Sequence, residues 1–128
     1  FYSLVHPTAI IYPNTLIGEG TIICGFTSIS CDCVIGNHVF VHPYCDFGHD
    51  VKIGSYCNIG AYTFLGGFAE IADLVTTHPH SSVMPHKKVG SGSIVGTGSV
   101  VMRNVPKNVT VHGNPAKVIF NEKNNSSY

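Results

Sequence analysis

The sequence has 128 residues, of which 11% are charged, and its formal net charge at pH 7 is zero. This length suits one domain with a core of its own, and the neutral balance argues against a nucleic-acid-binding protein, which is normally basic. The apolar runs are short, so we expect no segment that inserts into a membrane.

From residue 5 to residue 101, an apolar residue recurs at every sixth position, and only Thr77 interrupts the series. Four residues after each apolar position stands a small or β-branched residue, such as Thr21 or Cys33, with Lys87 as the exception. A glycine often follows the apolar residue directly. Helices would need a period of 3.6 residues, so the repeat predicts an all-β protein.

A six-residue unit fits one short strand and a corner. The large apolar side chain points inward, the small one fills the corner, and the glycine is expected to adopt corner dihedrals that other residues avoid. Three units make an 18-residue coil of triangular section, and successive coils pair as parallel strands about 4.8 Å apart. Residues 5–101 therefore predict a parallel β-helix of between five and six coils.

The last part of the chain leaves this frame. Residues 102–120 are predicted to form a short C-terminal capping tail, so that residues 1–120 make up the β-helix domain. Residues 121–128 are polar, and we expect this tail to be disordered.

The cysteines indicate a reducing compartment. They are odd in number and form no C-x-x-C pair, which argues against a disulfide framework and against a zinc ribbon. We therefore expect free thiols and a cytoplasmic protein.

The repeat, the segment Gly48-His49-Asp50, the pair Gly66-Gly67 and the sequence HGNPAK at 112–117 together resemble the hexapeptide-repeat acyltransferases. The closest group is the bacterial nucleotide-sugar N-acetyltransferases and the sialic-acid O-acetyltransferase-like proteins. The resemblance covers nearly all of residues 4–120. It implies a left-handed β-helix, a homotrimer, acetyl-CoA as the acyl donor and a sugar acceptor that is nucleotide-linked. Such proteins usually carry an N-terminal Rossmann-like domain that helps to bind the nucleotide sugar, and it would end where this sequence starts.

Residues 18 apart should stack on successive coils, which places His49 one strand spacing from Gly67. Acyl transfer from a thioester needs a base for the attacking group and a hydrogen-bond donor for the developing oxyanion. A histidine titrates near neutral pH, so His49 is the predicted general base and Asp50 is predicted to orient its ring. Gly67 lacks a side chain and can bring its N–H close to the thioester. The resemblance implies the same roles for His49 and Gly67.

Further candidates for the site rest mainly on the resemblance. His42 lies one corner away, where relatives often carry an asparagine near the acceptor, and it either binds the acceptor or merely packs. Asn58 stands where some relatives have a second histidine that contacts the acyl donor. The predicted CoA-binding residues are Asn58, Gly66, Gly67, Pro85, Lys88 and Lys117.

The basic residues concentrate in the C-terminal half, where six lysines or arginines stand against a single glutamate over residues 74–128. Such a charge can attract a phosphorylated ligand. Residues 76–88 are the least regular part of the repeat, and we expect them to bulge and to line the pantetheine channel. Lys87 or Lys88 would then lie near the CoA phosphates.

Two other classes of function remain open at this point. Histidines 78, 80 and 86 raise the possibility of a zinc lyase similar to the γ-class carbonic anhydrases, but that ligand spacing is not reproduced and no metal is expected. A non-catalytic trimeric scaffold would keep the repeat. For the enzyme as for the scaffold, flat faces without charges predict an obligate trimer. An intact His49, Asp50 and Gly67 favour the enzyme. N-acylation and O-acylation are not distinguished.

Overall fold

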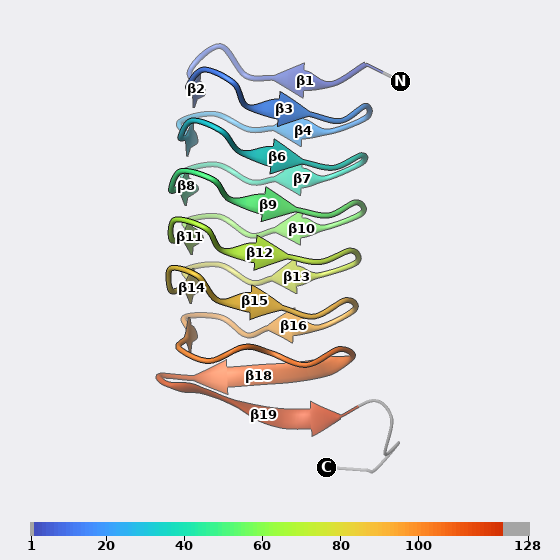
Figure 1. Ribbon diagram of the computed structural model, residues 1–128, viewed down its shortest axis with the longest axis vertical. Coiled ribbons are helices and arrows are strands. Elements are labelled where there is room, and N and C mark those ends of the chain that lie inside the picture. The colour runs from blue at the N-terminus through green and yellow to red at the C-terminus, as the bar shows by residue number, and fades with distance from the viewer. Residues whose placement is uncertain (1, 122–128) are drawn as a thin grey trace.

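The computed structural model describes residues 2–121 as a solenoid of short strands, with no helix and hence none that could cross a membrane (Figure 1). Strands β1 to β17 are two residues long, and each coil contributes one strand to each of three parallel sheets. The result is the predicted triangular β-helix of between five and six coils, followed by a closing hairpin.

The three sheets are called A, B and C here, and their strands follow in that order around each coil. Sheet A contains β1 (Leu4–Val5), β4 (Ile22–Ile23), β7 (Phe40–Val41), β10 (Asn58–Ile59), β13 (Thr76–Thr77), β16 (Ile94–Val95), β18 (Val109–Gly113) and β19 (Ala116–Asn121). Sheet B contains β2 (Ile10–Ile11), β5 (Ser28–Ile29), β8 (Asp46–Phe47), β11 (Phe64–Leu65), β14 (Ser82–Val83) and β17 (Val100–Val101). Sheet C contains β3 (Leu16–Ile17), β6 (Val34–Ile35), β9 (Lys52–Ile53), β12 (Glu70–Ile71) and β15 (Lys88–Val89).

The core follows the six-residue repeat, because the second residue of each strand points into the prism. Ile59 pairs with Val41 on one side and with Thr77 on the other, and all three are buried. Thr77, the exception in the apolar series, is accommodated by a hydrogen bond between its hydroxyl and that of Thr63 (3.2 Å). The Thr63 hydroxyl also donates to the Gly60 carbonyl (2.7 Å), so the buried polar atoms are satisfied.

The glycines that follow the apolar positions have a different role from the one we expected. The left-handed corner dihedral lies two residues beyond them, at residues such as Asp50 (φ 58°), Tyr56 (φ 59°) and Tyr62 (φ 60°). The glycines are needed instead because successive coils approach closely at each corner. A Cβ on Gly60, for example, would lie 2.6 Å from the carbonyl oxygen of Thr77.

Aromatic side chains stack along the corner between sheets A and B. The ring centroids of Phe26 and Tyr44 are 5.2 Å apart, those of Tyr44 and Tyr62 are 5.0 Å apart, and those of Tyr62 and His80 are 4.7 Å apart. These spacings match the distance between neighbouring strands. Left-handed dihedrals are uncommon for bulky residues, and the stacking offsets part of their cost.

The expected bulge at residues 76–88 is absent, and this expectation was wrong. Strands β13, β14 and β15 keep the 18-residue register, in which Ser82 pairs with Phe64 and Lys88 pairs with Glu70. The frame survives because the inward positions at Ser81 and Val83 remain fully buried. Lys87 takes the place of a small inward residue and is only half-buried.

The solenoid closes through a shortened last coil. Val105 bridges to Val89, which is 16 rather than 18 residues earlier. Strand β18 then pairs in parallel with β16, and β19 folds back antiparallel on β18. The predicted capping tail therefore begins as a further coil and ends as a hairpin. Strand β19 includes Asn121, and the rest of the polar tail, residues 122–128, lies outside the described residues.

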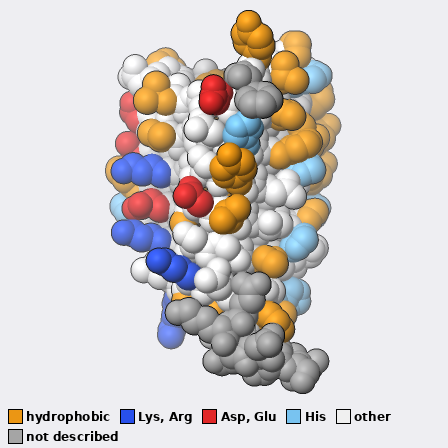
Figure 2. Space-filling view, turned by 90° about the vertical axis from the view of Figure 1, so that its right-hand side faces the viewer, with side chains coloured by type: hydrophobic (Ala, Val, Ile, Leu, Met, Phe, Trp, Pro, Cys, Tyr) orange, Lys and Arg blue, Asp and Glu red, His pale blue; other side chains and the backbone are white. Residues whose placement is uncertain are grey.

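The flat faces differ in charge, so our expectation of uncharged faces holds for sheet A but not for sheet C. The outward residues of sheet A from β1 to β16 are uncharged, whereas sheet C presents Lys52, Glu70 and Lys88. In Figure 2 the lysine and arginine side chains lie on the left of the view, whereas hydrophobic and histidine side chains line its right-hand side. Sheet A is therefore the face best suited to contact another protein surface.

The buried thiols lead to a prediction about stability at high pH. All five cysteines are free, and burial raises the pKa values of Cys45 and Cys57 to about 11 each. In the unfolded chain a thiol loses its proton at roughly pH 9. Between these values the unfolded chain binds fewer protons than the folded one, so the free energy of unfolding should fall as the pH rises, by about 2–3 kcal/mol per thiol at pH 11.

Urea denaturation at several pH values between 8.5 and 11 measures this effect. A Cys45→Ala/Cys57→Ala double variant is the matched control, because other titrating groups affect both proteins equally. Its stability should fall less steeply with pH than that of the wild type. Parallel curves would show that the two thiols do not contribute.

Candidate active site

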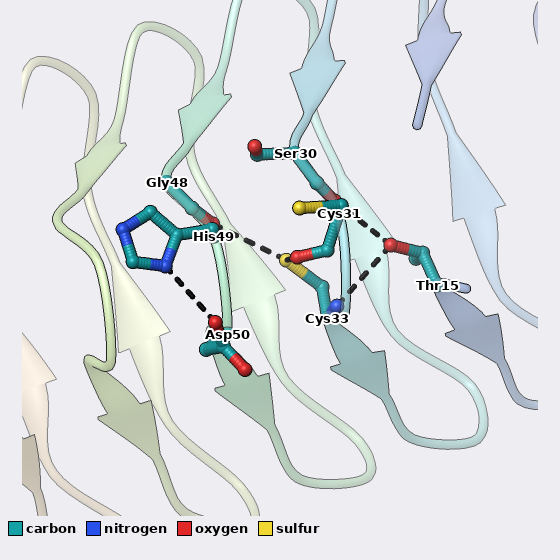
Figure 3. Close-up of polar contacts among 7 residues, drawn as sticks. All are labelled: Thr15, Ser30, Cys31, Cys33, Gly48, His49 and Asp50. Carbon is teal, nitrogen blue, oxygen red and sulfur yellow. Dashed lines mark hydrogen bonds and ion pairs between the residues drawn. The ribbon is translucent and has the colours of Figure 1, made fainter. Parts of the chain in front are cut away.

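His49 and Asp50 form a pair at the corner between sheets B and C (Figure 3). The Nδ1 atom of His49 lies 2.9 Å from Oδ2 of Asp50, and the side chains are 55% and 39% exposed. Because a carboxylate only accepts hydrogen bonds, Nδ1 carries a proton, and in the neutral imidazole the lone pair is then on Nε2. The imidazole is therefore accessible and arranged to accept a proton at Nε2.

The local sequence fixes this corner from both sides. Phe47 and Val51 are buried, so the chain between them must turn outside the prism. Asp50 adopts the left-handed conformation that short polar side chains tolerate. The thiol of Cys33, from the preceding coil, donates to the carbonyl of Gly48 (3.2 Å), as Figure 3 shows. His49 projects outward from an anchored turn.

Gly67 lies next to His49 on the following coil, as the 18-residue stacking predicted. A Cβ on Gly67 would lie 3.1 Å from Nε2 of His49, so only glycine leaves this space open. Within residues 2–121, the backbone N–H of Gly67 donates no hydrogen bond. A nitrogen that can accept a proton and an available N–H donor therefore lie side by side, which is the pair of groups that acyl transfer requires.

Gly66 and Pro85 continue the same corner toward the C-terminus. Gly66 is buried, and a Cβ on it would lie 2.6 Å from the backbone nitrogen of Pro85. Pro85 itself is exposed. The structure thus brings His49, Gly66, Gly67 and Pro85 together along one edge of the prism.

His42 and Asn58 meet each other at a different corner. Nε2 of His42 lies 2.9 Å from Oδ1 of Asn58, and the ring of His42 stacks on Phe40 at a centroid distance of 4.3 Å. His42 follows a strand of sheet A, whereas His49 follows a strand of sheet B. The pairing of His42 with Asn58 was not predicted, because Asn58 bonds a residue that precedes it by 16 rather than 18 positions.

Comparison with known proteins identifies the repeat. Residues 32–67 match the family described as bacterial transferase hexapeptide (six repeats). The match covers part of the six-residue repeat that runs from residue 5 to residue 101. Over 54 residues it is 37% identical to the GDP-perosamine N-acetyltransferase of Escherichia coli, a match that covers 42% of this chain and 24% of the relative.

Solved structures extend the likeness to nearly the whole chain. One is a perosamine N-acetyltransferase from Caulobacter crescentus with a histidine replaced by asparagine, in complex with CoA and GDP-perosamine (TM-score 0.91, 28% identity, 92% of this chain and 56% of that chain). Another is the acetyltransferase domain of PglB from Neisseria gonorrhoeae in complex with acetyl coenzyme A (TM-score 0.88, 27% identity, 91% and 57%). The predicted left-handed β-helix is confirmed. The chain spans little more than half the length of these structures.

The two lysines that were predicted to bind CoA lie in separate places. Lys88 is on sheet C, where its Nζ atom is 3.6 Å from Oε2 of Glu70, an ion pair that the sequence analysis missed. It borders a groove of about 780 Å³. Lys117 is on β19 and, together with Arg103, lines a pocket of about 330 Å³.

The three histidines that suggested zinc do not converge. His80 stacks on Tyr62 at the corner between sheets A and B, whereas His86 stacks on Phe68 at the corner between sheets B and C. His78 follows β13 of sheet A. In the described part of the chain, no cluster of three or more histidine, cysteine or acidic residues has a metal-binding arrangement.

Proposed function

We propose that this protein transfers an acetyl group from acetyl-CoA to the amino group of a nucleotide-linked sugar. The observation that carries the proposal is the geometry of His49, whose Nδ1 is held by Asp50 while Nε2 faces the open backbone of Gly67. The names of the similar proteins support it, since they describe N-acetyltransferases and complexes with CoA and GDP-perosamine. They favour an amine acceptor over a hydroxyl.

In this mechanism Nε2 of His49 removes a proton from the acceptor amine as the nitrogen attacks the thioester carbon. The Gly67 N–H donates to the carbonyl oxygen, which becomes negative in the tetrahedral intermediate. The C–S bond then breaks and the CoA sulfur leaves with the electron pair. The proton on His49 passes to that thiolate, so the products are CoA and the acetylated amine. No step requires a metal.

We further propose a homotrimer in which the uncharged sheet A contacts a neighbouring subunit. The His42–Asn58 pair borders this face, away from the His49 of the same chain. In this arrangement the pair would border the active site of the neighbouring subunit. His42 would then lie on the acceptor side of that site and Asn58 on its acyl-donor side. The free thiols fit an enzyme of the cytoplasm.

The test is to incubate the protein with acetyl-CoA and a panel of nucleotide amino sugars that includes GDP-perosamine, and to follow the products by mass spectrometry. Release of CoA together with an acceptor heavier by one acetyl group is the expected result. If none of these sugars is acetylated at millimolar concentration, the proposal is wrong. Hydration of carbon dioxide by a zinc-loaded sample would instead establish the zinc lyase. If the protein were inactive in both assays, the non-catalytic scaffold would be the remaining interpretation.

Binding of CoA gives a separate prediction. CoA should raise the melting temperature by mass action, and Lys88→Ala and Lys117→Ala should each reduce this increase, because each removes a positive charge available to the phosphates. Glu70→Gln should enlarge it, since the ion partner of Lys88 is lost. Differential scanning calorimetry measures these shifts. Lys107→Ala is the control, because Lys107 is exposed and lines neither the groove beside Lys88 nor the pocket beside Lys117. If CoA raised the melting temperature equally in all variants, neither lysine would be part of the CoA site.

A further inference from the structure

An aromatic ring contacts His49 from the coil that carries Gly67. The ring centroids of His49 and Phe68 lie 5.2 Å apart and their planes meet at 88°, so the edge of one ring faces the plane of the other. This perpendicular arrangement is a favoured geometry for aromatic pairs. It is distinct from the contacts that the proposed mechanism uses.

Phe68 is itself held in place. Its backbone N–H donates to the carbonyl of His49 (3.0 Å), which ties the two corners together directly. Its ring stacks on that of His86 from the next coil, with centroids 4.9 Å apart and planes at 6°. The N–H of His86 in turn donates to the carbonyl of Gly67 (3.0 Å). Phe68 therefore presents a fixed surface to the imidazole.

The imidazole of His49 needs such a surface, because its side chain is 55% exposed. An exposed side chain ordinarily samples several rotamers, and one hydrogen bond from Nδ1 to Asp50 leaves the ring free to swing about that bond. Productive proton transfer requires Nε2 to stay within hydrogen-bond reach of the acceptor amine. A second contact that restricts the swing would keep Nε2 beside Gly67.

We infer that Phe68 is a positioning residue for His49, and that His86 supports it by stacking on its ring. The inference rests on the proposed function. Phe68 fixes the plane of the imidazole, Asp50 fixes its tautomer, and Gly67 leaves the space into which Nε2 points. Small displacements of a catalytic group cost a large factor in rate. Loss of the Phe68 ring is thus expected to reduce kcat about tenfold, with little change in KM for acetyl-CoA.

The experiment combines turnover with NMR of the His49 ring. In Phe68→Ala, the ring protons of His49 should lose the ring-current shift caused by Phe68, and kcat should fall. Phe68→Tyr keeps the aromatic ring and should restore both. His86→Ala should give a smaller change in the same direction. Tyr56→Ala is the matched control, since Tyr56 has the same left-handed corner conformation (φ 59°) and stacks on His38 at another corner.

Unchanged His49 signals and turnover in a folded Phe68→Ala variant would overturn the inference, even if His49→Ala abolishes activity. Equal losses in Phe68→Ala and Tyr56→Ala would also overturn it, because the effect would then be a general loss of stability. If the wild type itself transfers no acetyl group, the proposed function fails. The NMR comparison still decides whether Phe68 orients the ring.

Discussion

Replacing His49 with alanine should lower kcat by about a hundred- to ten-thousand-fold, the usual range for the loss of a general base. The fold should persist, because the side chain is 55% exposed and lies outside the core. Affinity for CoA should change little, since the imidazole acts on the proton of the acceptor. Steady-state kinetics at saturating acetyl-CoA, with circular dichroism of the same sample, measure both expectations.

His42→Ala is the matched control for this experiment. His42 is also a partly exposed corner histidine with a hydrogen-bonded neighbour, but it lies on the other side of sheet B. Its loss should mainly raise KM for the acceptor. If His42→Ala abolished turnover and His49→Ala stayed near the wild type, the base would lie at the other corner and the assignment of His49 would be wrong.

Two adjacent glycines should respond to alanine in opposite ways. Gly66→Ala should destabilise the fold by about 3 kcal/mol. The added Cβ would lie 2.6 Å from a backbone nitrogen of the next coil, and neither backbone can move freely at this corner. Gly67→Ala should change stability by less than about 1 kcal/mol. The three atoms nearest to its Cβ would all belong to the imidazole of His49, with Nε2 at 3.1 Å, so the ring must shift and turnover should fall at least about tenfold.

Urea denaturation and acetyl-transfer assays on the two variants separate these effects. The two substitutions add the same methyl group at neighbouring positions of one turn, so each serves as the control for the other. A stable, fully active Gly67→Ala variant would show that Nε2 does not need the space at Gly67. A Gly66→Ala variant as stable as the wild type would show that the coils can separate at this corner.

The left-handed corners show why part of the structure was not predictable. Glycine is the residue that most readily adopts a positive φ, so the sequence favoured the glycines after the apolar positions. In the structure, residues such as Tyr44 and Tyr62 take that conformation, because stacking on the neighbouring coils offsets its cost. The glycines lie where backbones come too close for a Cβ. Both facts depend on contacts between residues far apart in the sequence.

By itself, the sequence determined the β-helix, its inward residues and the stacking of His49 over Gly67. These depend only on a fixed repeat, since burial of every sixth side chain sets the coil length and thus which residues are neighbours. Only the tertiary structure decided which outward side chains meet. The pairs His42–Asn58, Lys88–Glu70 and His49–Phe68 join residues on different coils. The 18-residue register makes Lys88 and Glu70 neighbours. Their ion pair, like the other two contacts, still depends on side-chain rotamers, which are set by the distance between coils and by the shape of each corner and not by the repeat.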